Sequence, residues 1–258
     1  MKRFLLDLAK APSRFKVLGL RGFVSVAIRT VLFDLRNWLW DMRHGVNTRQ
    51  RIPVSELALE GLPNSENAEA YTASTPALLD RLGVLNLDWN SFVFVDLGCG
   101  KGKALLLAAR FPFMRVIGVE LSDKLARLAR QNVSTYRYSD LKCRNIEVLN
   151  GDAAAYMFPA ERLMVYCFNS FSGAVVREVL RNLNQSLRQH PRAAYFLYAN
   201  PVWESVFVEC GFMRLVQREQ SYQVYAAVTM AGDAAKTPEQ TPATIPEPAL
   251  RRAVSHRA

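Results

Sequence analysis

The sequence predicts an α/β protein with a doubly wound, mainly parallel sheet of seven strands. Three observations predict this fold class. Short apolar runs alternate with segments of helical periodicity between residues 92 and 228, one apolar run turns over glycines directly into a helix, and acidic residues follow successive apolar runs. Such alternation is typical of parallel strands joined by right-handed crossover helices. Half of the residues are apolar, which is enough for a sizeable core.

Composition divides the 258 residues into four parts. We expect a basic amphipathic helical arm at 1–51, a linker at 52–67, the α/β domain at 68–230 and a disordered tail at 231–258. The tail is rich in Ala, Pro and Thr, so it lacks the apolar surface that a chain needs to order itself.

The arm carries most of the charge of the chain. Residues 1–51 hold 11 Lys or Arg against three acids, a net of +8 out of +10. Arg29, Arg36 and Arg43 recur beside an apolar stripe, while Phe33 and Trp40 fall on the polar side. Three interpretations stay open: a cap helix packed on the domain, a helix attracted to anionic lipid, and a docking element for nucleic acid or protein. The stripe consists of Val24, Ile28, Val31, Leu35, Trp38, Leu39 and Met42.

No stretch of the arm predicts a membrane span or a cleaved signal, because charged residues interrupt its apolar segments. The four cysteines show no paired spacing and the three histidines are scattered, so we expect reduced thiols and no metal site. These features predict a cytoplasmic protein, peripheral at the inner face of the membrane if the arm binds lipid.

The first strand of the domain leads into a glycine-rich turn. The run Phe92–Leu97 contains Asp96 near its end, and Gly98, Gly100 and Gly102 alternate with other residues before a helical pattern starts. A strand that turns over glycines into a helix brings backbone N–H groups close to a ligand. The dinucleotide fingerprint fails because its sixth position is Lys103, and the phosphate loop of nucleotide hydrolases fails at two positions.

The later strands also end in polar residues. Glu120 ends the second strand, 24 residues after Asp96, and Gly151-Asp152-Ala153 follows the third. The fourth strand, 164–168, ends in Asn169-Ser170-Phe171. A fifth strand at 193–198 precedes a helix and a closing antiparallel hairpin at 212–216 and 222–228. Because ligands bind outside the carboxyl ends of parallel strands, these acids are expected at one site.

The acid-x-Gly-x-Gly-x-Gly turn resembles the first motif of class I S-adenosylmethionine-dependent methyltransferases, which have a Rossmann-like sheet with a reversed strand near one edge. The resemblance covers roughly residues 68–228 and is closest in detail to bacterial members of unassigned substrate. Some likeness to nucleosomal lysine methyltransferases lies in the acid-rich motifs and in the Asn…Phe element after the fourth strand.

The resemblance implies S-adenosylmethionine as the cofactor and assigns residues to it. Glu120 would accept hydrogen bonds from the ribose hydroxyls, and Asp152 would meet the adenine amino group. Taken alone, Asp96 could cap a helix, Glu120 could be a solvated charge and Asp152 could mark a turn. The expected cofactor-binding residues are Tyr71, Thr75, Asp96, Gly98, Gly100, Gly102, Glu120, Asp152 and Ala153.

The expected catalytic residues are Asn169 and Phe171. Methyl transfer needs the reacting atoms in line, so positioning and desolvation should supply much of the acceleration. The Asn169 amide oxygen could orient an amine, or Asn169 could be a turn residue, and Phe171 could wall the pocket or cover the sheet. Ser170 departs from the Asn-Pro-Pro-aromatic pattern of the amine-methylating members. Lys101 and Lys103 are expected to be solvated lysines at a helix start.

The sequence therefore predicts a methyltransferase that acts on an unidentified protein or small molecule, with an amine such as protein lysine among the acceptors. A NAD-dependent oxidoreductase and a noncatalytic, membrane-docked adaptor that binds the cofactor are the alternatives. Outside the arm, 22 basic residues nearly balance 20 acidic ones, which argues against nucleic acid as the partner. The oligomeric state is not predicted.

Overall fold

The fold was analysed in a computed structural model, which describes residues 28, 30–49, 52–57, 59, 61, 64, 82, 85, 87–137, 139, 141–219 and 221–228. Tyr71, Thr75 and the predicted tail at 231–258 lie outside the described residues. In chain order the strands and helices of the domain are β1 (Phe92–Leu97), α4 (Lys103–Ala108), β2 (Arg115–Glu120), α5 (Asp123–Thr135), β3 (Ile146–Asn150), β4 (Arg162–Phe168), α6 (Gly173–Gln189), β5 (Ala194–Ala199), α7 (Glu204–Glu209), β6 (Met213–Glu219) and β7 (Tyr222–Ala227).

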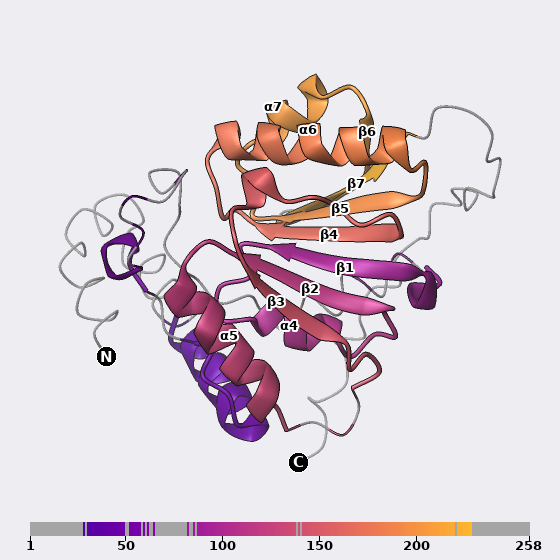
Figure 1. The fold of residues 1–258 in the computed structure, drawn as a ribbon. Coiled ribbons are helices and arrows are strands. Elements are labelled where there is room, and N and C mark those ends of the chain that lie inside the picture. Colours follow the sequence, from indigo (N-terminus) through magenta and orange to yellow (C-terminus); the bar gives the residue numbers. More distant parts are fainter. Residues whose placement is uncertain are drawn as a thin grey trace, which may run out of the picture. The chain divides into compact units, whose positions relative to one another are not determined.

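These strands form one sheet in the order β3-β2-β1-β4-β5-β7-β6 (Figure 1). The first five strands pair in parallel, and β7 runs antiparallel to both β5 and β6. β1 lies between β2 and β4 and all of its residues are buried, which explains its nearly unbroken apolar sequence. The sheet confirms the predicted fold class, including the reversed strand near one edge.

Helices cover both faces of the sheet (Figure 1). Because side chains alternate along a strand, Phe94 packs on one face with residues of α4 and α5. Val93 and Val95 pack on the other face with α6 and α7. α6 turns its whole apolar stripe toward the sheet, so the 3.6-residue periodicity of this segment correctly indicates which of its faces is buried.

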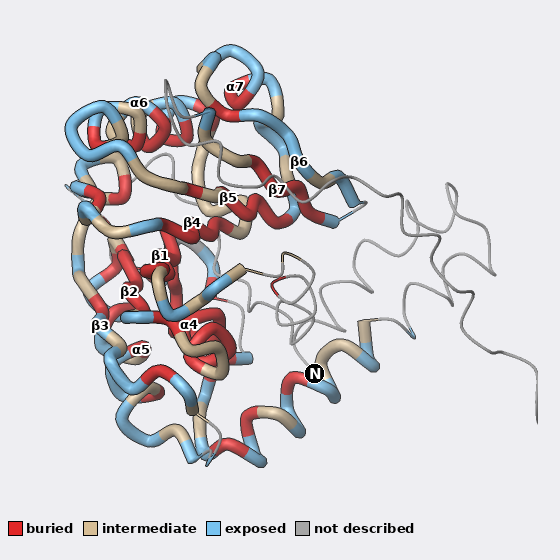
Figure 2. Tube along the Cα trace, turned by 90° about the vertical axis from the view of Figure 1, so that its right-hand side faces the viewer, coloured by how far each residue is buried: buried red, intermediate tan, exposed pale blue. Residues whose placement is uncertain are grey.

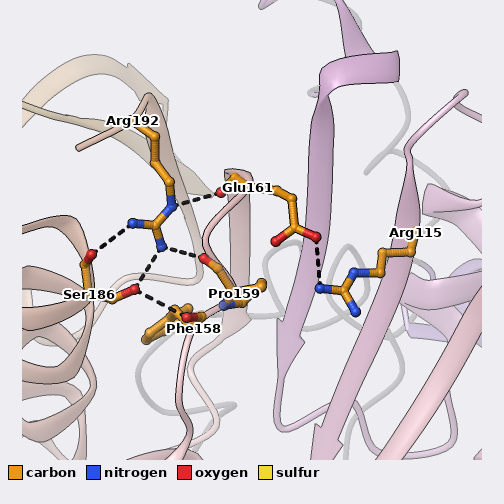
Figure 3. A network of polar contacts seen from close by, with 6 residues as sticks. All are labelled: Arg115, Phe158, Pro159, Glu161, Ser186 and Arg192. Atoms are coloured by element: carbon orange, nitrogen blue, oxygen red, sulfur yellow. Dashed lines mark hydrogen bonds and ion pairs between the residues drawn. The ribbon is translucent and has the colours of Figure 1, made fainter. Parts of the chain in front are cut away.

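A network of polar contacts, drawn in Figure 3, lies where β2, β4 and β5 begin. The Arg192 guanidinium donates to the carbonyl of Glu161 at 2.7 Å, and to the Ser186 carbonyl and hydroxyl at 2.9 and 2.8 Å. Glu161 in turn pairs with Arg115 at 3.0 Å. One side chain thus joins the end of α6 to the segment that enters β4.

Within the predicted arm, residue 28 and residues 30–44 are helical, and we call this segment the arm helix. It lies beside α5 (Figure 1, indigo). The His44 ring stacks on the Tyr136 ring with 5.2 Å between centroids, and the Trp40 ring lies 5.9 Å from the same ring. Beyond the helix, the Asn47 amide donates to Asn132 of α5 at 2.9 Å. The arm helix therefore packs on the domain.

The face that packs is not the apolar one. Asn37, Asp41 and His44 are buried, whereas the described residues of the predicted apolar stripe are exposed, with Leu39 at 53% and Met42 at 66%; Val24 lies outside the described residues. Figure 2 shows buried residues recurring along the helix among exposed ones. The cap-helix interpretation is right about the contact, but the stripe does not make it.

Buried polar groups explain this orientation. Asp41 accepts hydrogen bonds from the Thr48 amide and hydroxyl at 2.8 and 2.6 Å and from the Arg49 amide at 2.9 Å. Asn37 accepts a short hydrogen bond from Lys103 of α4. These polar groups are buried, and leaving them unpaired would cost more than leaving the apolar stripe exposed.

Lys101 and Lys103 correct a second expectation. Neither lysine is solvated: their exposed fractions are 2% and 1%. The Lys103 ammonium lies 4.5 Å from the centroid of the Trp40 ring, which is a cation–π contact. Burial lowers the pKa of Lys103 to about 8, and the Asp41 charge opposes the shift. The arm helix supplies the partners that let this lysine stay buried.

Candidate functional site

A cavity opens at the carboxyl edge of the sheet, where β1, β2 and β4 end. It encloses about 190 Å³, and residues from all three strand ends line it. The predicted site residues among its lining are Asp96, Gly98, Gly100, Glu120, Asp152, Ala153, Asn169 and Phe171. The structure thus brings eight of the eleven predicted site residues to one hollow. Tyr71 and Thr75 lie outside the described residues, and Gly102 lies in the turn without lining the cavity.

The glycine turn is held against β2. Gly98 and Cys99 both donate their amides to the Val119 carbonyl, at 2.8 and 3.0 Å. Gly98 has φ +74°, and a Cβ there would come within 2.6 Å of the Ser170 Cβ. Only glycine satisfies both constraints, because other residues are strained at this φ and would also displace the loop after β4. The turn and the loop after β4 therefore approach closely.

Gly102 has a structural role at the start of α4. It adopts φ +80° immediately before α4, and a Cβ there would lie 3.2 Å from the Ala129 Cβ of α5. The residue lets the chain turn into α4 and lets α5 approach. Its position explains its identity without a ligand, so the structure gives the cofactor role predicted for Gly102 no support.

Glu120 is a buried acid whose hydrogen bonds to the backbone are complete. One carboxylate oxygen accepts from the Gly100 amide at 2.8 Å and the other from the Ser122 amide at 2.9 Å. Burial raises its pKa, while these backbone amides oppose the shift. Each oxygen retains a second lone pair, so the side chain can fix the glycine turn and still accept from a ligand.

Asp96 is also a buried acid, but unlike Glu120 it has no hydrogen-bond donor among the described residues. Only 3% of it is exposed, and no group in the described part of the chain donates a hydrogen bond to its carboxylate. Burial, and then the nearby Glu120 charge, raises its pKa well above the usual value. Buried carboxylates normally have donors. A buried carboxylate that lines a cavity and has no donor indicates a binding site for a ligand that is cationic or donates hydrogen bonds.

Asp152 borders the cavity after β3. One of its oxygens accepts from the Ala154 amide at 2.8 Å, which caps the short helical turn Ala153–Ala155. The other accepts from the Asn64 side chain at 2.7 Å. The turn-forming role that Asp152 could have by itself is therefore present, and the same side chain also faces the hollow.

The loop after β4 closes the side of the cavity next to the glycine turn. Asn169 adopts φ +39°, a left-handed conformation that asparagine tolerates better than most residues. Phe171 packs against the core on the α6 face and lines the cavity, and its carbonyl accepts from the Trp203 indole at 3.0 Å. Phe171 thus walls the pocket and also covers the sheet.

Sequence reasoning missed several lining residues, among them Asn64, Asn200 and Tyr166. Asn200 could have been found, because it follows β5 at the same carboxyl edge, and its φ of +49° marks a tight turn. Asn64 comes from the predicted linker, and nothing local in the sequence indicates that it meets Asp152. Tyr166 sits inside a strand and reads as a core residue.

Charge in the cavity is predominantly negative. Asp96, Glu120 and Asp152 line it, and Lys103 is the only basic residue among the described lining. Because Lys103 has a lowered pKa and its ammonium is directed to Asn37 and Trp40, it neutralises this potential only weakly. The cavity therefore favours cations and hydrogen-bond donors over anions.

Comparison with known families agrees with this site. Residues 94–190, which run from β1 to just beyond α6, match the family model described as a methyltransferase domain. The matched span contains the glycine turn and the residues that follow β2, β3 and β4. No curated protein sequence matches the chain.

Among solved structures, the chain is similar to ribosomal protein L11 methylase from Lactobacillus delbrueckii subsp. bulgaricus, at 14% identity over 60% of this chain and 79% of that chain, with a TM-score of 0.43. It is also similar to the PH0226 protein from Pyrococcus horikoshii OT3, at 15% identity over 59% and 88%, with a TM-score of 0.44. The methyltransferase domain of bacterial CtHen1-CN gives 14% identity over 59% and 97%, with a TM-score of 0.43. Values this low leave the sheet order itself as the evidence for the fold.

The strand order with its reversed β7 is the one expected for the class I methyltransferase fold, and the match over residues 94–190 agrees with that fold. Over residues 94–190 the chain is similar to methyltransferase domains. The nicotinamide alternative gains no support.

Proposed function

We propose that this protein is a methyltransferase that binds S-adenosylmethionine in the cavity at the carboxyl edge and transfers its methyl group to an amine that enters beside Asn169. The observation that carries the proposal is the pair of buried acids, of which Glu120 has backbone donors and Asp96 has no donor among the described residues. A ligand with a positive charge and several donors would complete this pair. S-adenosylmethionine carries a sulfonium, an ammonium and two ribose hydroxyls.

The residues present fit that cofactor. Glu120 has lone pairs left for the ribose hydroxyls, and Asp96 would face the ammonium group. Asp152 and Ala153, at the end of β3, would border the adenine. Gly98 and Gly100 bring the backbone close, because neither carries a side chain into the cavity.

When bound, the cofactor supplies an electrophilic methyl group on a sulfonium. The contribution of the protein is to orient the acceptor and exclude water. The Asn169 amide oxygen would accept a hydrogen bond from the acceptor amine and so aim the nitrogen lone pair. Phe171 and Tyr166 form apolar walls that keep water from the reacting atoms.

An amine acceptor is supported by the character of the cavity. Its acids attract an amine in its protonated form, which can attack only after it has lost a proton to water, and the amide oxygen at Asn169 accepts from nitrogen but cannot donate. Protein lysine has the required chemistry, and so does a small primary amine. Ser170 stands where the amine-methylating members have proline, and serine does not fix the backbone of the loop as proline does. Both kinds of amine therefore remain open as acceptors.

Cofactor binding is tested by calorimetric titration of the full chain with S-adenosylhomocysteine and, separately, with NAD. We expect S-adenosylhomocysteine alone to bind, and Asp96→Asn to weaken that binding at least about tenfold, because one charged hydrogen-bond acceptor is lost. Asn90→Ala, an exposed change beyond the opposite end of β1, is the matched control. Binding of NAD alone, or an unchanged affinity in Asp96→Asn, would overturn the assignment.

Methyl transfer to an amine is tested by supplying S-adenosylmethionine with a labelled methyl group to fractionated cell extract. Acid-stable label on lysine or on a small amine is the expected product. With that acceptor, Asn169→Ala should lower kcat at least about tenfold while S-adenosylhomocysteine affinity stays unchanged. Label found only on oxygen or carbon, with normal cofactor binding, would reject the amine and leave the cofactor assignment intact.

A further inference from the structure

The outer face of the arm helix is an apolar surface that the described domain does not cover. Its side chains occupy the helix face opposite the buried residues Asn37, Asp41 and His44, and each is more than a third exposed. For Leu35 and Met42 the exposed fractions are 46% and 66%. This outer stripe consists of Ile28, Val31, Leu32, Leu35, Trp38, Leu39 and Met42. A contiguous surface of this kind marks an interaction site.

The orientation of the stripe is fixed by the contacts on the other side of the helix. Asn37 is held by Lys103 of α4 and the His44 ring stacks on Tyr136, while Asp41 accepts from Thr48 and Arg49 in the loop that follows the helix. The helix cannot rotate its apolar side inward without breaking these buried contacts. The stripe is therefore a constant feature of the folded domain.

Charges border the stripe with a single sign. In the described part of the arm helix, the exposed charged residues are Arg36 and Arg43, seven residues apart and therefore on the same side. Asp41 is turned into the domain and Asp34 is half-buried. Burial of the acid thus leaves the outer surface more basic than the helix sequence by itself would be.

We propose that the outer stripe docks on an anionic lipid surface. An apolar face flanked by arginines suits the boundary between acyl chains and acidic headgroups. None of the described helices is long and apolar enough to cross a membrane, so the arm helix would lie along the surface. A second copy fits less well, because a symmetric contact would bring the same arginines together with no exposed acid on the helix to pair with them.

The proposal is tested by flotation of the full chain with two kinds of vesicle, phosphatidylcholine alone and phosphatidylcholine mixed with phosphatidylglycerol. We expect flotation with the mixed vesicles at low salt, reduced at high salt. Leu35→Asp with Leu39→Asp should reduce binding at least about tenfold by removing two apolar side chains. Arg36→Glu with Arg43→Glu should reduce it at least about tenfold at low salt and less at high salt.

A matched control separates the stripe from general surface effects. Met157→Asp with Val208→Asp changes two side chains that are 87% and 79% exposed elsewhere on the domain, and it should float as the unchanged chain does. Absence of flotation, or equal flotation of the Leu35/Leu39 variant, would overturn the proposal. So would a dimer in light scattering that this variant converts to a monomer while no chain binds vesicles, since the occupant would then be a second copy.

Discussion

Two regions of this molecule bury charged side chains, and they differ in whether the protein supplies the partners. Where the arm helix meets the domain, Asp41 accepts three hydrogen bonds and Lys103 is directed to Asn37 and Trp40. At the carboxyl edge of the sheet, Asp96 is equally buried and lacks a donor in the described chain. A complete set of partners indicates a structural contact, whereas an incomplete set next to a cavity indicates a ligand site.

The largest effect on the contrast between the two regions is expected from a substitution of Asp41. Asp41→Ala should lower the free energy of unfolding by about 3 kcal/mol, because three donors lose their acceptor and Lys101 and Lys103 lose a nearby negative charge. Urea denaturation at neutral pH measures the change. Glu209→Ala, which removes an exposed ion pair with Arg177, is the control and should cost less than about 1 kcal/mol. Equal costs would show that the arm contact is not a stabilising part of the domain.

Lys103 tests the same contact through pH. Its pKa is lowered from 10.5 to about 8, so between these values the unfolded chain holds a proton that the folded chain lacks. Stability contributed by this group therefore rises with pH across the window, by up to about 3 kcal/mol. The difference in unfolding free energy between the unchanged chain and Lys103→Met should grow by that amount from pH 8 to pH 10.5. A difference that is flat with pH would mean that the lysine is not held in a desolvated site.

Loss of the charge on Asp96 should stabilise the folded chain, whereas loss of the charge on Asp41 should destabilise it. Its folded pKa lies well above 3.8, so the folded carboxylate resists ionisation and its contribution to stability falls as pH rises through that raised value. Asp96→Asn should therefore raise the unfolding free energy at neutral pH, by about 1 kcal/mol. Glu120→Gln should lower it instead, because an amide nitrogen cannot accept from the backbone. Thermal denaturation of the two variants decides between these signs, and destabilisation of both would contradict the distinction.

The smallest change in unfolding free energy is expected from a substitution in the outer stripe. Leu39→Asp lies on the same helix as Asp41 but on its exposed side, so it should change the unfolding free energy by less than about 0.5 kcal/mol. Measurement beside Asp41→Ala in the same denaturant series gives the contrast directly. A cost near that of Asp41→Ala would show that the stripe is covered in solution.

Much of the fold could be predicted because its signals are local. The alternation of apolar runs with helical segments predicts β1 to β5 in order, and the hairpin β6–β7 follows from its spacing. Acids and asparagines after these runs come together because parallel strands end at the same edge. The site residues that were missed, such as Asn64 and Tyr166, gave no comparable local signal.

The arm helix and α6 show where local patterns stop being sufficient. Both have amphipathic periodicity, yet α6 buries its apolar stripe and the arm helix exposes it. Periodicity places apolar residues on one side of a helix and says nothing about which neighbour that side will meet. For the arm helix, the neighbour is a set of polar groups that includes Lys103, 66 residues further along the chain from Asn37.

The sequence by itself determined the order of the elements, the glycine turn and the acids at the strand ends, because each depends on residues close together in the chain. Only the tertiary structure decided that Lys103 is buried and that Asn64 reaches Asp152 across 88 residues. It also decided that, within the described part of the chain, Asp96 lacks the donors that Glu120 has. These outcomes depend on which distant groups fill or leave open a given space. Such long-range pairing of donors, acceptors and charges leaves no periodic trace in the chain.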